Sequence, residues 1–323
     1  MSIQNARQQI ENFPSQCTLI DTPVLKISGR DVEGIVIAGM GGSALSGEIL
    51  KNYLEYKHFK LPVFIVRDYK LPSFVNKKYL VFVQSYSGNT EETVSVLRDA
   101  YIRQLKPIVI STGGILVDLA KKYNLPIIFL PNNFQPRLAI GYFLFAELSV
   151  LNSIFDLGID EEIEKIREIK WSTHENYAKK IVEKIDGIPI IYASNMLSSV
   201  PVIWKALINE CSKSHCFANV FSEQNHNEMM GFISSKNFYV ILLQDEEDHY
   251  RIKKRMYIFQ EEMKKLNVKT LLLNFKGSSF FQRILSLIHI GMWIAFHLAI
   301  KNDQDPEKVE LIEDFKKKLG RFI

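Results

Sequence analysis

Short apolar runs rich in Val, Ile and Phe alternate along the chain with longer segments in which apolar residues recur at helical spacing. Strands that alternate with helices are typical of βαβ units and a parallel sheet. In the first half, the pattern predicts helices that include 44–54, 90–103 and 117–122, and strands at 34–38, 63–66, 80–84, 107–111 and 127–130. We expect a doubly wound sheet with right-handed crossovers.

A second series of the same kind follows a charged stretch at residues 160–170, with strands expected at 188–193, 238–243 and 270–274 and helices at 202–214, 252–266 and 284–300. Single cores seldom grow past about 250 to 300 residues, so 323 residues should form two subdomains. We place them at 1–152 and 153–323. The expected fold class is α/β, with two subdomains that are each a doubly wound parallel sheet flanked by helices, an αβα sandwich.

Two segments of the sequence indicate where in the cell the protein is found. The stretch 284–300 is uncharged and just short of the roughly 20 residues that span a bilayer. It contains Ser286, His289 and His297, and we interpret it as a buried core helix rather than a membrane span. The first 13 residues are polar with mixed charge and lack the apolar middle of a secretion signal. We therefore expect a cytoplasmic protein without a membrane partner.

Charge and cysteine content narrow the function further. The chain has 40 basic and 36 acidic residues, a net charge of +4 with no long basic run, which argues against general nucleic-acid binding and leaves a small anionic substrate possible. Cys17, Cys211 and Cys216 are too few and too unevenly spaced for a disulfide framework or a four-ligand zinc site. We expect no metal.

The first candidate ligand loop is Gly39-Met40-Gly41-Gly42-Ser43-Ala44, between a predicted strand and a predicted helix. Glycines let the backbone turn sharply and approach a ligand, and the free amides of a helix start attract an anion. The loop predicts a phosphate cradle. Its spacing also fits a dinucleotide fingerprint, with Asp68 as a possible ribose partner, so this loop alone does not choose between the two.

The second candidate loop is Ser85-Tyr86-Ser87-Gly88-Asn89-Thr90-Glu91-Glu92-Thr93, again between a strand end and a helix start. Its hydroxyls and the amides of the helix start are suited to binding an oxyanion. Helix capping by Thr90 is the alternative, because Thr90, Thr93 and the acidic residues would begin any helix well. Capping leaves the paired serines and Gly88 unexplained, so we favour anion binding.

These two loops and Ser111-Thr112-Gly113-Gly114 together resemble a sugar isomerase (SIS) domain. Pro136-Arg137, Asn209-Glu210-Cys211-Ser212-Lys213 and Asn225-His226-Asn227-Glu228 resemble, more closely, the archaeal and bacterial bifunctional phosphoglucose/phosphomannose isomerases, and the likeness covers nearly the whole chain. The resemblance implies two SIS subdomains in a homodimer. It also implies interconversion of fructose 6-phosphate with glucose 6-phosphate and mannose 6-phosphate through a cis-enediol, without metal or cofactor.

The resemblance also implies roles for individual residues. The phosphate-binding positions are taken by Gly42, Ser43, Ser85, Ser87 and Thr90, and the polar catalytic positions by Arg137, Glu210 and His226. A lysine of the C-terminal helix completes the set. Ile312, Lys316 and Leu319 fit the family's spacing, although Lys317 and Lys318 leave the register open. In the related isomerases the histidine reaches the active site of the partner subunit.

The chemistry explains why such residues are needed. One carboxylate, Glu210, would move a proton between carbons 1 and 2, Arg137 would stabilise the enediolate, and His226 would open the sugar ring. Each has a plainer interpretation: Glu210 as a surface glutamate before Lys213, Arg137 paired with Glu147 or a neighbouring lobe, and His226 as an ordinary loop histidine.

The chain departs from the family at two positions, with Ile203 where a basic residue is usual before Trp204 and Ser222 where a proline is often found. The departures bear on substrate preference more than on reaction type. A non-catalytic SIS regulator is the main alternative function. We disfavour it because the first strand begins by about Gly34, which leaves no room for a DNA-binding module. A nicotinamide oxidoreductase would not need the second phosphate loop.

Overall fold

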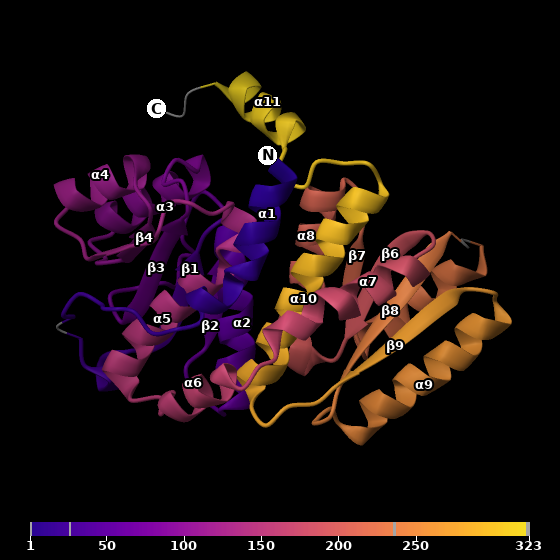
Figure 1. Ribbon diagram of the computed structural model, residues 1–323. Helices are drawn as coiled ribbons and strands as arrows, with labels where there is room; N and C mark the ends of the chain where they lie inside the picture. The colour runs from indigo at the N-terminus through magenta and orange to yellow at the C-terminus, as the bar shows by residue number, and fades with distance from the viewer. Residues whose placement is uncertain (1, 26, 235–236, 321–323) are drawn as a thin grey trace. The chain divides into compact units, whose positions relative to one another are not determined.

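The computed structural model describes residues 2–25, 27–234 and 237–320 (Figure 1). Contacts divide the chain into two compact units: unit 1 is Met1–Glu11 with Glu164–Val309, and unit 2 is Asn12–Ile163 with Glu310–Ile323. Helix α1 (Ser2–Glu11) thus belongs with the second half of the chain, and helix α11 (Glu310–Leu319) belongs with the first half. A single division at residue 152 does not describe this exchange of terminal helices.

Unit 2 contains a five-stranded parallel sheet in the order β2-β1-β3-β4-β5. Its strands lie within a residue or so of the predicted ones: β1 (Gly34–Ala38), β2 (Val63–Val66), β3 (Tyr79–Ser85), β4 (Ile108–Ser111) and β5 (Ile127–Phe129). β-Branched residues favour these extended segments because they pack well on a pleated surface. The central strands are buried on both faces, which is why they read as continuous apolar runs.

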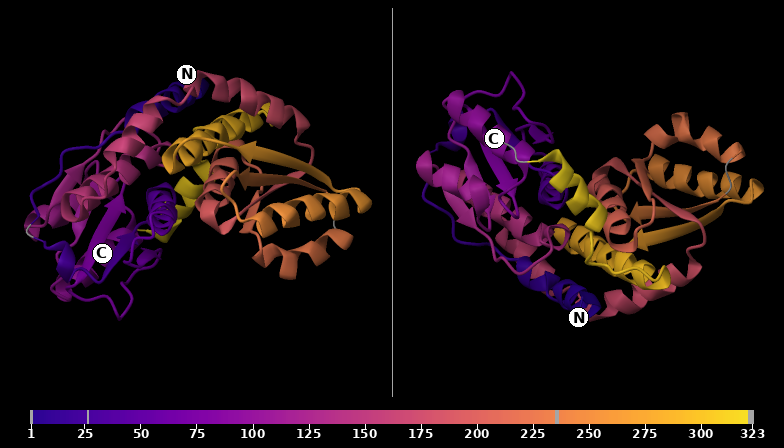
Figure 2. Two further views of the ribbon diagram at one scale, coloured as in Figure 1. Left: turned by 90° about the horizontal axis from the view of Figure 1, so that it is seen from below. Right: turned by 90° about the horizontal axis from the view of Figure 1, so that it is seen from above.

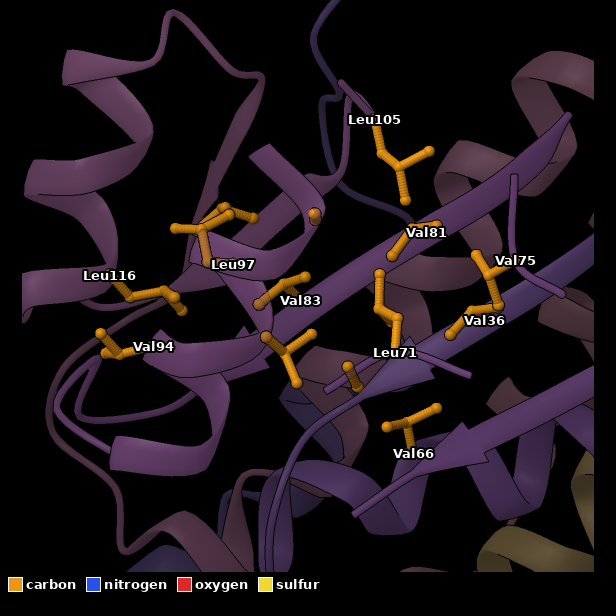
Figure 3. Packing of buried hydrophobic residues seen from close by; sticks show 14 of the residues in the cluster. Val36, Val66, Leu71, Val75, Val81, Val83, Val94, Leu97, Leu105 and Leu116 are labelled. Carbon is orange, nitrogen blue, oxygen red and sulfur yellow. The ribbon is translucent and has the colours of Figure 1, made fainter. Parts of the chain in front are cut away.

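The helices of unit 2 cover both faces of this sheet, and they are α2 (Gly42–Tyr56), α3 (Glu91–Ile102), α4 (Gly114–Lys122) and α5 (Ile140–Phe155). Figure 3 shows one face, where Val36, Val81 and Val83 of the strands pack against Leu97 of α3 and Leu116 of α4. Helix α6 (Asp160–Arg167) runs across the division between the two units.

Unit 1 contains a four-stranded parallel sheet in the order β7-β6-β8-β9. Its strands are arranged in the same way as β2-β1-β3-β4 of the sheet in unit 2. The strands are β6 (Ile188–Ala193), β7 (Phe217–Val220), β8 (Phe238–Asp245) and β9 (Lys269–Phe275). Strand β7 was not among the predicted strands. The predicted α/β class with two parallel sheets flanked by helices is confirmed.

The main helices of the second half that pack in unit 1 are α7 (His174–Lys184), α8 (Ser199–Ser212), α9 (Tyr250–Lys265) and α10 (Phe280–Lys301). Figure 2 shows α9 on one face of the sheet and α10 on the other. Helix α10 is long and apolar enough to cross a membrane, but 78% of its apolar window is buried inside the protein. The indole of Trp204 donates to the carbonyl of Leu287, and Gly291 leaves room for its ring. The prediction of a buried core helix is confirmed.

Candidate active site

The two predicted ligand loops lie at the same end of the sheet in unit 2, where its parallel strands have their carboxyl ends. Strands β1 and β3 are neighbours, although β2 comes between them in the sequence and pairs on the other side of β1. The loop that contains Ser43 follows β1, and the loop from Ser85 to Thr90 follows β3. A reversal of strand order of this kind opens a crevice at the carboxyl ends of the strands, where open parallel sheets bind ligands.

A hydrogen bond links the two loops. The hydroxyl of Ser43 is buried and accepts the backbone N–H of Tyr86 at 3.0 Å. Helix α2 begins beside it at Gly42, after Gly41 takes a left-handed conformation with φ of 49°. The first amides of a helix have no partner within the helix, and its dipole is positive at this end. The loop therefore presents donors to an anion.

The hydroxyls of the second loop are arranged around one another rather than around the helix start. Ser85 Oγ lies 2.8 Å from Thr90 Oγ1 and accepts the N–H of Gly88 at 3.1 Å. Thr90 is the N-cap residue of α3, yet its side chain makes no capping bond. Ser87 is exposed beside it. Capping by the Thr90 side chain, the plainer interpretation, is not what the structure shows.

Two glycines allow the backbone segments at the carboxyl ends of these strands to approach one another closely. Gly88 has φ of 67°, and a Cβ there would lie 1.7 Å from the carbonyl oxygen of Gly113. A Cβ on Gly42 would lie 2.6 Å from the carbonyl oxygen of Pro136 and 2.7 Å from the Cα of Arg137. Gly42 therefore brings the Arg137 segment against the first loop, in addition to its expected place at the phosphate.

Arg137 is buried in a short 3₁₀ segment, η3 (Pro136–Leu138), and its guanidinium donates to Gln135 Oε1 at 3.4 Å. The segment that precedes it is held by Tyr86. The phenol of Tyr86 donates to the carbonyl of Pro131 at 2.6 Å and accepts the N–H of Phe134 at 2.9 Å. One residue of the second loop thus fixes the approach to Arg137. This role of Tyr86 was not predicted from the sequence.

Lys316 shares a cavity with the second loop. A cavity of about 640 Å³ lies between the start of α3 and helix α11, and its lining includes Ser87, Thr90, Ile312 and Lys316. All of these residues belong to unit 2. Of the three candidate lysines, Lys316 is the one that lines the cavity, which favours the predicted register.

Glu210 and His226 belong to unit 1. Glu210 is half-buried in the last turn of α8, and His226 is exposed at the end of the 3₁₀ segment η6 (Glu223–His226). Seven of the nine predicted site residues lie in unit 2, and the roles of Glu210 and His226 stay predictions. Ile203, the first departure from the family, is fully buried in α8, where a basic side chain would have to bury its charge.

No group of three or more His, Cys, Asp or Glu side chains within residues 2–25, 27–234 and 237–320 is placed to hold a metal ion. The hydroxyls and amides of the two loops fit an oxyanion.

Comparisons with known proteins identify the class. Glucosamine-6-phosphate deaminase from Thermotoga maritima superposes with a TM-score of 0.70 at 16% identity, covering 95% of this chain and 96% of that one. The model of the bacterial phospho-glucose isomerase C-terminal SIS domain matches residues 174–319. The fold is that of the SIS phosphosugar proteins.

Sequence relatives are more specific. The bifunctional phosphoglucose/phosphomannose isomerase of Aquifex aeolicus is 36% identical over 299 residues, which is 90% of this chain and 91% of that protein. The chain belongs to the bifunctional phosphoglucose/phosphomannose isomerase family. A D-glucosamine-6-phosphate 4-epimerase of Sulfolobus acidocaldarius is 31% identical over 241 residues, 70% of this chain and 72% of that protein.

Proposed function

We propose that this protein is an aldose–ketose isomerase of the cytoplasm that interconverts fructose 6-phosphate with glucose 6-phosphate and mannose 6-phosphate, without a metal. One observation carries the proposal: in a chain of this family, two hydroxyl-rich loops meet at the carboxyl ends of the neighbouring strands β1 and β3. Hexose phosphates are the substrate class that such a site and such relatives support.

The phosphate of the substrate is bound by the loops of unit 2. Ser43, Ser85, Ser87 and Thr90 supply hydroxyls, and the starts of α2 and α3 supply amides and a positive dipole. Gly42 lets the backbone approach the ligand. Hydrogen bonds to a charged oxygen are roughly twice as strong as neutral ones, which suits a dianionic group.

Isomerisation then needs one base and one cation. Glu210 removes the proton from carbon 2 of the open-chain aldose and returns it to carbon 1, so a single carboxylate serves both steps. The intermediate is an enediolate, and Arg137 stabilises its negative charge with a rigid planar donor group. A planar carbon 2 has lost its stereochemistry, so protonation from either face gives the glucose or the mannose epimer.

Ring opening comes before proton transfer. His226 passes a proton between the hydroxyl of carbon 1 and the ring oxygen, because a neutral imidazole has one nitrogen that donates a proton and one that accepts it. Lys316 assists as a donor, and its position in the cavity beside Ser87 and Thr90 supports this role.

The deciding experiment offers each sugar phosphate separately to the purified protein with a chelator present. Fructose 6-phosphate should give both aldoses, and reaction in deuterium oxide should place deuterium at carbon 2 of the products. Glu210→Gln should abolish turnover and retain binding, whereas Glu183→Gln, an exposed glutamate of α7, should be as active as wild type. Turnover by Glu210→Gln would exclude Glu210 as the base.

Two further outcomes separate the alternatives. Binding of hexose phosphates with no turnover of any of them would favour a non-catalytic SIS regulator. Conversion of glucosamine 6-phosphate at carbon 4, with no aldose–ketose reaction, would place the chain with its epimerase relative instead.

We also propose that the protein is a homodimer in which His226 completes the site of the partner subunit. Mixing Glu210→Gln with His226→Ala protein tests this directly. If His226 acts across the interface, each mixed dimer has one site with both groups intact, so an equal mixture should recover about a quarter of wild-type activity. If His226 acts within its own subunit, every site has one defect and no activity returns.

A further inference from the structure

A fully buried carboxyl group lies beneath the two phosphate loops of unit 2. Glu147 is on α5, a helix that is otherwise largely apolar, and it is 0% exposed. Its Oε1 accepts hydrogen bonds from Ser46 Oγ at 2.7 Å and from Gln84 Nε2 at 2.8 Å. Within the described residues, Glu147 Oε2 and Gln84 Oε1 have no hydrogen-bond partner.

The same cluster holds the phosphate loops in place. Gln84 is the residue before Ser85 in β3, and its Nε2 also donates to the carbonyl of Ser43 at 2.5 Å and to Ser46 Oγ at 3.0 Å. Ser46 lies in α2, one turn after Ser43. One carboxyl oxygen therefore ties together the end of β3, the second turn of α2 and the middle of α5. The second loop begins at this junction, and the first loop ends beside it.

The protonation state of Glu147 follows from these surroundings. Burial raises the pKa of Glu147 from 4.5 to about 8, opposed by the hydrogen bonds from Ser46 and Gln84. An ionised carboxylate would leave a buried charge with one oxygen unpaired, which is costly. The titratable side chains on the elements packed against α5 are Glu48, Lys51, Tyr53, Glu55 and Tyr56 on α2 and Arg137 on η3.

We propose that Glu147 is a neutral carboxylic acid that positions the phosphate loops, and that its ionisation weakens the binding of the substrate's phosphate group. The proposal rests on the proposed function in one respect, that these loops bind phosphate. Glu147 is a positioning residue, because it acts through Ser43, Ser46 and Gln84 and not on the substrate.

Two effects make ionisation unfavourable to binding. A negative charge beneath the loops repels a dianion in surroundings that screen charge poorly. The charged group also demands more donors than Ser46 and Gln84 supply, so the junction must rearrange to admit water or other groups. By linkage, phosphate binding must in turn raise the proton affinity of Glu147. Binding near pH 8 therefore takes up protons.

The experiment measures binding without turnover. Sorbitol 6-phosphate has no carbonyl group and cannot isomerise, and its phosphate stays a dianion above pH 7.5 because the second pKa of a phosphate ester is about 6. If only the neutral form of Glu147 binds, a pKa of about 8 predicts that the affinity falls about 25-fold between pH 7.5 and 9.5. Calorimetry in buffers of different ionisation heat measures both the affinity and the proton uptake.

Glu147→Gln keeps a neutral side chain of the same size, so its affinity should match wild type at pH 7.5 and stay constant up to pH 9.5. Glu55→Gln, an exposed residue of α2, should retain the wild-type pH profile. A constant wild-type affinity, or an alkaline loss retained by Glu147→Gln, overturns the proposal. If Glu147→Gln does not fold, the absence of proton uptake by the wild-type protein at pH 8 overturns it equally.

The result of this binding experiment does not depend on whether the protein catalyses isomerisation. A protein that binds sorbitol 6-phosphate with the expected pH profile but isomerises nothing would overturn the proposed function alone. An active isomerase whose binding of this ligand is independent of Glu147 and of pH would overturn the present inference alone.

Discussion

Acid should unfold unit 1 through a buried pair of histidines, His174 of α7 and His289 of α10. Their Nδ1 atoms lie 3.0 Å apart, and His289 Nε2 lies 3.0 Å from the carbonyl oxygen of Ile10. A carbonyl only accepts, so His289 carries its proton on Nε2 and its Nδ1 must accept from the Nδ1–H of His174. Protonation of His289 would place a second Nδ1 proton against the first and break this bond, whereas protonation of His174 would add a buried charge at its Nε2.

The magnitude follows from the pKa values. The pKa of each histidine is lowered from 6.5 to about 4: burial is the cause for His174, and for His289 burial acts with the neighbouring His174 against the opposing hydrogen bond to Ile10. The unfolded chain therefore binds protons more tightly than the folded one, and stability is lost as the pH falls from 6.5 towards 4. Between pH 7 and pH 5 each histidine should cost about 2 kcal/mol, and the pair about 4 kcal/mol.

Tryptophan fluorescence reports the loss of stability in unit 1, which contains both histidines. All three tryptophans, Trp171, Trp204 and Trp293, belong to unit 1, and the ring of Trp171 lies 5.2 Å from that of His289. Urea unfolding followed by tryptophan fluorescence at pH 7, 6 and 5 gives the free energy of unfolding at each pH. Glu147 of unit 2, whose pKa is raised, changes stability in the opposite direction over this range, so the quantity to compare is a difference between variants.

The matched variant replaces both histidines by glutamine, which does not titrate. The stability difference between wild type and this double variant should shrink by about 4 kcal/mol from pH 7 to pH 5. His215→Asn, which changes an exposed histidine of the same unit, should leave the wild-type pH dependence unchanged. A difference that stays constant across this range would refute the reasoning.

Two other predictions concern the active-site edge of unit 2. Tyr86→Phe removes the bonds to Pro131 and Phe134 that precede Arg137, so kcat should fall with little change in KM, together with about 1 to 2 kcal/mol of stability. Unfolding curves that show the loss of stability with an unchanged kcat would reduce Tyr86 to a structural role. Gly88→Ala should raise KM at least tenfold and cost about 2 to 4 kcal/mol, because its Cβ would overlap the Gly113 carbonyl. Steady-state kinetics and urea unfolding measure both, and a wild-type KM would contradict it.

The strands were predictable because their cause is local. A run of β-branched residues between polar segments marks a buried parallel strand, and β1, β2 and β6 have the bounds that the pattern predicts. Strand β7 was missed because it lies at the edge of its sheet, is only partly buried and includes Asn219. The hydrophobic pattern is weak where one side of a strand has no neighbour.

The candidate site likewise has a part that was predictable from local sequence and a part that was not. The phosphate loops were predictable because their glycines and hydroxyls are contiguous in the sequence and lie between a strand and a helix. Glu147 and Tyr86 were not, because their roles come from contacts with Ser46 and Pro131, which are distant in the sequence. A glutamate in the middle of an apolar helix was the one available signal. It received only the interpretation of a possible partner for Arg137.

The exchange of terminal helices has a consequence for how the protein is made. The sheet of unit 2 and both of its phosphate loops are translated before residue 164, whereas α11, with Lys316, belongs to the same unit and follows all of Glu164–Val309. A nascent chain at the ribosome can thus bury the sheet of unit 2 early, but the cavity wall that carries Lys316 is added only after the other unit has been synthesised. The part of the protein that can fold first acquires this wall only after the other unit has been translated.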